Sequence, residues 1–357
     1  MLLVLSSLFG ATGGIPAFNR LLVAAAGEFA AAQGLPLRIV ALTDPVDGPP
    51  PAGVAYVPCG GDRARCGAET LRALPQHPFA ILGHVNLAPL GLVARLLGRP
   101  FGVIAHGTDV WTPLSWNRRQ ALRLARVVAC VSSDTAAHVV SQQGVAAERC
   151  LRIINAIATV PEPPPVQQID SGLLRILSVT RLHPDEPKGI DLMLHALAGL
   201  PGRRLTYTVI GDGDARPSLR ALAETLGLAD RVRFVGLVSD AERDAALAEC
   251  DLFALPSSNE GFGIVYLEAM AQAKPCLAAR VGGAPEVVLD GETGLCVEPT
   301  VLAVRAAIVR LSDPALREKL GAAGRARLLS HFTYDAFRRH AFELFTRLSD
   351  PSRRSDG

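Results

Sequence analysis

The chain has 357 residues, which is long for a single hydrophobic core and suits two domains. Hydrophobic residues make up 49% of it and charged residues 20%, a balance that excludes an intrinsically disordered or fibrous protein. The formal net charge of +2 gives no general argument for binding nucleic acid.

Residues 1 to about 155 alternate short apolar runs with helical patterns, beginning at Leu2–Ser6. The start has no basic leader and no apolar stretch of signal-peptide length, so we expect a strand and not a targeting segment. Near-continuous apolar strands joined by helices indicate a parallel sheet covered on both faces, an α/β Rossmann-like domain. The predicted strands are Leu2–Ser6, Leu37–Leu42, Val54–Val57, Phe79–Leu82, Phe101–Ala105, Val127–Val131 and Arg152–Ile154.

A glycine-rich turn, Phe9–Pro16, follows the first strand and contains the pair Gly13-Gly14. It lacks the Gly-x-Gly-x-x-Gly fingerprint of dinucleotide-binding domains, which argues against a nicotinamide oxidoreductase. Two interpretations stay open from the residues alone: a turn that needs positive φ, or a loop whose backbone approaches a ligand.

His106 and Asp109 come directly after the strand Phe101–Ala105, and His84 and Asn86 follow the preceding strand. Ligands meet parallel sheets at the carboxyl ends of their strands, so these side chains are site candidates. A single histidine at such a place is nonetheless more often structural, and His84 and Asn86 also fit an ordinary polar loop.

The helical pattern Ser115–Ala125 is basic and has two tryptophans near its start. A basic helix with such aromatics fits an anionic membrane surface, and it also fits a plain solvated face. The arginines that would make this peripheral contact are Arg118, Arg119, Arg123 and Arg126.

The proline-rich run 160–166 predicts a stiff linker, after which the strand and helix alternation restarts. We therefore expect an N-terminal domain over 1–165, a C-terminal Rossmann-like domain over 166–330 and a last helical segment over 331–357, with the site in a cleft between the domains. The strands predicted in the second half are Leu174–Thr180, Arg204–Ile210, Val232–Val235, Leu252–Leu255, Cys276–Ala279 and Leu295–Val297.

Arg181 and Lys188 lie in the loop after the first strand of the second half. The chain has 36 basic residues, of which Lys188, Lys274 and Lys319 are the only lysines, so a lysine in this loop stands out. On their own the two residues fit a solvated basic loop.

The segment Ser257–Pro275 reads as a polar turn after a buried strand, followed by a helix that Pro275 ends. Free N–H groups at the start of such a helix attract anions, a phosphate above all. Glu260 and Glu268 frame the segment, and helical geometry separates them by roughly 10 Å. A glycosidase pair needs about 5–9.5 Å, so two contacts to one long ligand fit better than hydrolysis.

This segment carries a family resemblance. Asn259–Ala271, together with Val281–Val288 and Asp290–Gly294, resembles the signature of family 4 retaining glycosyltransferases of the GT-B fold, in which two Rossmann-like domains face one another across a cleft. The last helix, with Phe337, Ala341 and Phe345 on one side, is similar to the helix that returns to the first domain in that fold.

The resemblance implies that a hexosyl unit moves from a nucleotide-diphosphate sugar, with UDP-sugars favoured and GDP-mannose next, to a glycan or lipid-linked acceptor. It implies catalytic roles near the sugar for three residues and donor contacts for nine. The catalytic set is His106, Glu260 and Asp109; the donor-binding set is Gly13, Gly14, Arg181, Lys188, Gly261, Phe262, Gly263, Ile264 and Glu268.

These groups could stabilise a leaving diphosphate without a divalent cation, so we expect no metal ion and no cofactor. Seven cysteines without a Cys-x2-Cys pair predict free thiols in a reducing compartment, hence a cytoplasmic protein. A non-catalytic sugar-nucleotide binding protein and a GT-B phosphorylase or epimerase remain as alternatives.

Overall fold

The computed structural model describes residues 1–10, 13–48, 53–162 and 172–350. It divides into two compact units: unit 1 comprises Met1–Ala158 and Tyr334–Gly357, and unit 2 comprises Thr159–Thr333. The segment 160–166, predicted as a linker, lies partly outside the described residues, and the end of the chain from 351 to 357 lies wholly outside them.

In the described part of unit 1, seven parallel strands form one sheet in the order β3-β2-β1-β4-β5-β6-β7. The strands predicted from the sequence are confirmed, with bounds shifted by at most two residues. The observed strands are β1 Leu2–Leu5, β2 Arg38–Ala41, β3 Ala55–Pro58, β4 Ala80–Leu82, β5 Phe101–Ala105, β6 Val127–Cys130 and β7 Cys150–Arg152.

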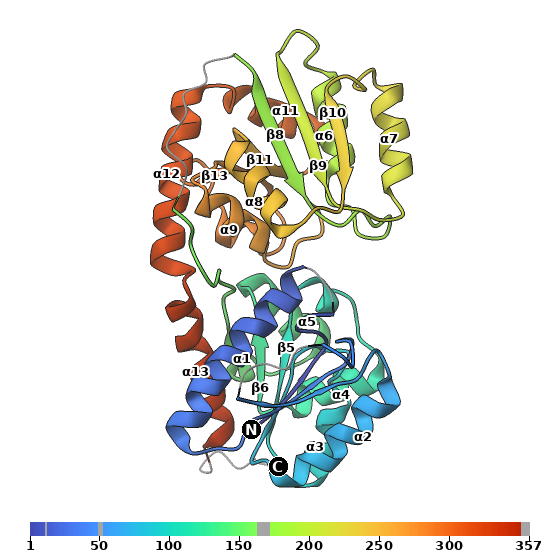
Figure 1. The fold of residues 1–357 in the computed structure, drawn as a ribbon, viewed down its shortest axis with the longest axis vertical. Helices are drawn as coiled ribbons and strands as arrows, with labels where there is room; N and C mark the ends of the chain where they lie inside the picture. Colours follow the sequence, from blue (N-terminus) through green and yellow to red (C-terminus); the bar gives the residue numbers. More distant parts are fainter. Residues whose placement is uncertain (11–12, 49–52, 163–171, 351–357) are drawn as a thin grey trace. The chain divides into compact units, whose positions relative to one another are not determined.

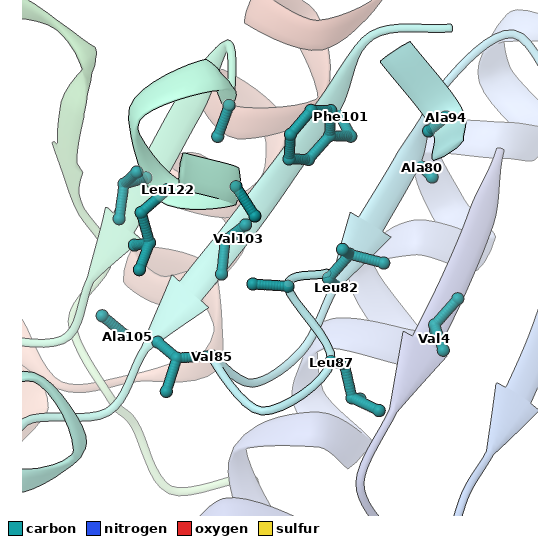
Figure 2. Close-up of a cluster of buried hydrophobic side chains, with 14 of the residues drawn as sticks. Val4, Ala80, Leu82, Val85, Leu87, Ala94, Phe101, Val103, Ala105 and Leu122 are labelled. Carbon is teal, nitrogen blue, oxygen red and sulfur yellow. The ribbon is translucent and has the colours of Figure 1, made fainter. Parts of the chain in front are cut away.

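The central strands of unit 1 are buried residue after residue, because helices cover both faces of a parallel sheet. Figure 2 shows one side of this core, where Val103 of β5 lies between Leu82 of β4 and Leu122 of helix α4, Trp116–Leu124. The helices of unit 1 are α1 Gly14–Gln33, α2 Arg63–Ala73, η1 Leu74–Gln76, α3 Leu90–Leu96, η2 Thr108–Val110, α4 Trp116–Leu124, α5 Ser133–Gln143, η3 Ala147–Arg149 and α13 Tyr334–Ser349.

The C-terminal helix α13 packs along α1, so the two ends of the chain share one core (Figure 1, red and blue). Phe337 of α13 meets Phe18 of α1 edge to face, with ring centroids 5.2 Å apart. Tyr334 and Arg338 donate hydrogen bonds to the Glu28 carboxylate at 2.6 and 3.1 Å.

In unit 2, six parallel strands of the described chain form a second sheet in the order β10-β9-β8-β11-β12-β13. Its strands are β8 Leu174–Val179, β9 Leu205–Ile210, β10 Val232–Gly236, β11 Leu252–Leu255, β12 Cys276–Ala279 and β13 Gly294–Val297, which confirms the six predictions. Its helices are α6 Ile190–Ala198, α7 Arg216–Thr225, α8 Asp240–Glu249, α9 Ile264–Ala271, α10 Ala284–Val287, α11 Val301–Arg310 and α12 Pro314–His331.

Helix α9 ends four residues before Pro275, so the expectation that this proline terminates it was wrong. Gln272 is the C-cap, and Ala273 adopts φ +53. The Lys274 N–H then donates to the Ala269 carbonyl, which closes the helix before the proline is reached.

Both sheets have the doubly wound order in which the direction of winding reverses beside the first strand of the unit. The reversal lies between β1 and β4 in unit 1 and between β8 and β11 in unit 2. Loops leaving these strand pairs diverge, and ligands of open α/β sheets bind in the space this leaves. The loop after β11 carries Glu260, and the loop after β8 carries Lys188.

Candidate functional site

Lys188 and Glu260 meet at the reversal point of the unit 2 sheet. The Lys188 Nζ donates to the Asn259 carbonyl at 2.6 Å and lies 3.6 Å from Glu260 Oε2. Both charged side chains are only 15% exposed. An ammonium group has three N–H donors, so one remains for a ligand after these two partners.

Glycines hold the loops that carry these two residues in close contact. Gly189 has φ +75, and a Cβ there would lie 2.2 Å from the Pro256 carbonyl oxygen. A Cβ on Gly283 would lie 2.2 Å from the Gly261 carbonyl oxygen, and the Gly283 N–H donates to the Glu260 carbonyl at 3.0 Å. Backbone contact this close excludes any larger residue without a shift of the loops.

Helix α9 starts at this place, with Gly263 as its N-cap at φ +94. The Tyr266 ring lies where a Cβ on Gly263 would be, 2.3 Å from its nearest ring atom. First-turn N–H groups of a helix lack intrahelical partners, and with the helix dipole they favour an anion. The predicted donor contact Phe262 has a buried side chain that packs on Phe332, so only its backbone is available.

Glu268 lies on α9, and the structure places it near Arg243 of α8. Burial raises the pKa of Glu268 above its ordinary value, with Arg243 acting in the opposite direction. Arg243 itself pairs with Asp240 and Asp244 at 2.9 Å. Glu268, the second of the two glutamates noted in the segment Ser257–Pro275, is therefore a partly buried hydrogen-bond acceptor.

Arg181 contacts an acid of its own loop. Arg181 lies 3.4 Å from Glu186, and its side chain is 70% exposed. The donor contact that the resemblance implies for Arg181 therefore stays a prediction.

In unit 1, His84, His106 and Asp109 come together after β4 and β5. The imidazoles of His84 and His106 stack with centroids 5.7 Å apart, and Asp109 Oδ2 lies 3.8 Å from His84 Nε2. The Asp109 carboxylate accepts the His106 backbone N–H at 3.0 and 3.2 Å. Asp109 thus shapes the turn that holds His106.

Hydrogen bonds fix the neutral forms of both rings. The Asn86 N–H donates to His84 Nδ1 at 3.0 Å, which places the His84 ring proton on Nε2, toward Asp109. His106 Nε2 lies 2.9 Å from the Gly83 carbonyl, to which it donates, and its Nδ1 then remains an acceptor. Such an acceptor suits a hydroxyl group.

Burial is the main cause of the low pKa of both histidines. It lowers the pKa of His84 to about 4 against the opposing effect of Asp109, while the charges of His106 and Arg118 lower it further. Burial also lowers the pKa of His106, with Asp109 and the Gly83 carbonyl opposing. Both rings are neutral at pH 7.

These shifts predict acid lability. The folded pKa of His84 lies below its unfolded value near 6.5, so the unfolded chain binds more protons between about pH 6.5 and 4. Its contribution to stability is complete above pH 6.5 and is lost as the pH falls toward 4, by roughly 1–3 kcal/mol. We expect His84→Gln to flatten the pH dependence of urea unfolding over this range.

His195→Gln is the matched control, because His195 is exposed on α6. It should leave the pH dependence as in the wild type. If the free energy of unfolding depended equally on pH in the wild type and in His84→Gln, the neutral, buried state of His84 would be contradicted.

Sequence reasoning did not single out one aromatic and one acidic residue, Phe18 and Asp44, that contact this part of unit 1. Phe18 of α1 meets His106 edge to face at 5.1 Å and links it to α13 through Phe337. Asp44 accepts hydrogen bonds from the loop after β1. An acid directly after a buried strand, at the sheet edge where ligands bind, is a recognisable signal for Asp44.

The predicted Gly13 is the N-cap of α1 at φ +124, and Gly14 begins that helix.

Three of the four arginines named for a membrane contact donate hydrogen bonds within unit 1, and the membrane contact itself stays a prediction. Arg119 and Arg123 donate to the Gln143 carbonyl at 3.2 and 2.8 Å. Arg126 donates to the carbonyls of Leu348 and Asp350. Arginine forks stabilise the carbonyl ends of helices, which the charge pattern of α4 alone does not reveal.

All seven cysteines are free thiols, as predicted, and six of them are buried. Within the described ranges, no group of three or more His, Cys, Asp or Glu side chains is arranged to hold a metal ion. Over the same ranges, each helix is too short or too polar to cross a membrane.

Comparison with known proteins gives matches over both units. Residues 161–327 match the family model described as Glycosyl transferases group 1, and residues 23–160 match the model described as Glycosyltransferase Family 4. Over 263 residues, 67% of this chain and 68% of the relative, the sequence is 35% identical to the GDP-mannose-dependent alpha-(1-6)-phosphatidylinositol monomannoside mannosyltransferase of Mycolicibacterium smegmatis.

Two further matches concern a second enzyme and a solved structure. The chain is 29% identical over 255 residues, 64% of its length and 66% of the relative, to alpha-D-kanosaminyltransferase of Streptomyces kanamyceticus. The structure of Anabaena Alr3699/HepE in complex with UDP and glucose superposes with a TM-score of 0.75 at 22% identity. That match covers 97% of this chain and 99% of the Anabaena chain and shows a shared fold.

Proposed function

The chain belongs to the family 4 glycosyltransferases of the GT-B fold, and from this premise we propose that it transfers a hexosyl unit from a nucleotide-diphosphate sugar to a glycan or lipid-linked acceptor. The observation that carries the proposal is the meeting of Lys188 and Glu260 at the reversal point of the unit 2 sheet. A compact cation beside a carboxylate suits a ligand that joins a phosphate to a sugar.

In the proposed reaction, the leaving diphosphate gains charge as the bond to the sugar breaks. Lys188 and the first-turn amides of α9 stabilise that charge, because donors fixed in place need no reorganisation. Arg181 joins them by exchanging Glu186 for a phosphate, since its side chain is exposed and ends in a planar fork. The amides of Gly13 and Gly14 add donors from the start of α1.

Carboxylates and a histidine hold the sugar and ribose hydroxyls in this proposal. Glu260, together with the backbone amides from Gly261 to Ile264, binds the hexosyl hydroxyls. Glu268 accepts hydrogen bonds from the ribose, a role that its partly buried carboxylate fits. His106 uses its free Nδ1 to accept a hydrogen bond from the transferred sugar, and Asp109 keeps His106 in place.

We propose retention at the anomeric carbon, with the leaving phosphate taking the acceptor proton on the same face of the sugar. In this proposal Lys188, Arg181 and the backbone amides stabilise the negative charge of the leaving diphosphate, so the reaction proceeds without a metal ion. UDP-sugars are the favoured donors, with GDP-mannose next. The free cysteine thiols suit a reducing cytoplasm as the place of the reaction.

A thermal-shift screen of UDP-sugars and GDP-sugars in EDTA, followed by an assay for release of the diphosphate, tests the function. The proposal expects one donor class to raise the melting temperature and to release its diphosphate slowly without acceptor. Stabilisation without any release or transfer would instead identify a non-catalytic sugar-nucleotide binding protein. No stabilisation by any donor would refute the proposal.

A further inference from the structure

The loop after β1 is fixed by a single buried carboxylate. The backbone N–H groups of Leu8, Phe9 and Gly10 donate to Asp44 Oδ1 at 2.8, 3.0 and 2.8 Å. The Ser7 hydroxyl donates to the same oxygen at 2.7 Å. Successive amides that converge on one point form a nest for an anion, and this nest holds a carboxylate of the chain itself.

The carbonyls of this loop are fixed as well. Thr43 donates to the Ser6 carbonyl through its N–H at 2.9 Å and its hydroxyl at 3.0 Å. The fully buried Asn19 of α1 donates to the Ser7 carbonyl at 2.8 Å. Arg20, also on α1, donates to the Leu8 carbonyl at 2.7 Å. Donors from α1 and from Thr43 therefore hold the carbonyls of residues 6–8 in a single arrangement.

The fit between this loop and the segment after β2 leaves no space. A Cβ on Gly10 would lie 2.4 Å from the Thr43 carbonyl oxygen and 2.9 Å from the Asp44 Cα. This backbone contact is independent of the hydrogen bonds to the carboxylate. The backbone contact and the hydrogen bonds both hold the loop after β1 against Asp44.

Asp44 is 1% exposed, and its second oxygen accepts the Tyr56 hydroxyl at 2.6 Å. Burial acts to raise the pKa of Asp44, but hydrogen bonds from Tyr56, Ser7, Gly10 and Leu8 together bring it below its ordinary value. Burial and the Asp44 charge raise the pKa of Tyr56, so the phenol stays neutral and donates. The nest is thus filled by an ionised group at neutral pH.

We propose that Asp44 is a positioning residue for sugar transfer: its carboxylate occupies the amide nest after β1 and so fixes residues 7–10, which precede Gly13 and Gly14 at the start of α1. This rests on the proposed function, in which those two glycines donate to the leaving diphosphate. The amides of residues 8–10 are used internally, so the proposal leaves the diphosphate to the amides of Gly13 and Gly14. The effect of Asp44 then falls on the transition state, where the diphosphate charge develops.

Asp44→Asn in the full chain tests this proposal, because a neutral amide oxygen accepts the four donors more weakly than a carboxylate oxygen does, and the amide NH2 cannot accept the Tyr56 hydroxyl. We expect kcat to fall at least about tenfold, while the KM for the sugar nucleotide stays within about threefold. Affinity for the free nucleoside diphosphate, measured by calorimetry, should stay within about threefold of the wild type, since Lys188 and the first-turn amides of α9 also bind the diphosphate in the proposed function. Both tryptophans of the chain, Trp111 and Trp116, lie in unit 1, so their fluorescence during urea unfolding counts the molecules with a folded unit 1 and separates a loss of folded protein from a loss of kcat.

Asp47→Asn is the matched control, because Asp47 lies three residues further on and is exposed. It should leave kcat as in the wild type. If Asp44→Asn does not fold, Ser7→Ala replaces it: this variant removes one donor to Asp44 Oδ1 and should lower kcat about threefold.

A kcat per folded molecule within twofold of the wild type, in Asp44→Asn or in its replacement Ser7→Ala, would overturn the positioning role and leave a structural one. Failure of the proposed function would look different, because the wild type itself would then release no diphosphate from any sugar nucleotide.

Discussion

Lys188→Ala is expected to lower kcat/KM for sugar transfer by about 10²–10³-fold, the usual effect of removing one preorganised donor to a developing anion. The side chain is 15% exposed and contacts Asn259 and Glu260, so its position is set before a donor arrives. Its loss removes the cation at the reversal point and leaves the Glu260 carboxylate without its partner. Steady-state release of the nucleoside diphosphate measures the effect.

Lys319→Ala is the matched control, since Lys319 is exposed on α12 and should leave turnover unchanged. Lys188→Arg should restore only part of the activity, because the planar fork needs more room than an ammonium group between two closely packed loops. Turnover near the wild-type level in Lys188→Ala would contradict the site assignment.

Gly263→Ala is expected to destabilise unit 2 by about 3 kcal/mol and to abolish measurable donor binding. The new methyl group would lie 2.3 Å from the ring of Tyr266, at a backbone φ of +94. Tyr266 cannot move aside readily, because it is fully buried and its hydroxyl donates to the Leu255 carbonyl at 2.6 Å. The first turn of α9 must shift instead, and its amides leave their places. Urea unfolding and donor calorimetry measure the two effects.

Gly291→Ala separates the steric clash from backbone strain. Gly291 also lies in unit 2 at φ +75, but nothing lies within 4 Å of the added Cβ. We expect a cost of about 1 kcal/mol and normal donor binding. Equal effects of the two variants would show that positive φ alone matters and that the start of α9 is not a closely fitted site.

Sequence reasoning found the strands because each is a continuous apolar run between turn residues, as in β5 and β11. The resemblance to the family signature singled out Lys188 and Glu260, and the structure places both in loops that leave the unit 2 sheet at its reversal point. The end of α9 was missed because Ala273 takes a left-handed conformation that side-chain patterns favour only for glycine or asparagine.

Partners far apart along the chain escaped prediction. Asp44 receives its donors from residues 7 to 10, which are more than 30 positions away, so its place after a buried strand marks it as a candidate but does not reveal these contacts. Arg123 looks like a surface charge in the sequence, but it binds a carbonyl 20 residues further on. Charge patterns locate arginines, while folding decides whether they face solvent or a helix end.

The most direct test of the central claim is release of the diphosphate from a panel of UDP-sugars and GDP-sugars by the wild type and Glu260→Gln, with EDTA and with free-nucleotide affinity measured alongside. The claim is that Glu260 and Lys188 hold the sugar and the phosphate of one donor at the edge of the unit 2 sheet. It predicts release from one donor class by the wild type, a loss of about 10²-fold or more in Glu260→Gln and equal nucleotide affinity in both. Equal release by both proteins would contradict it.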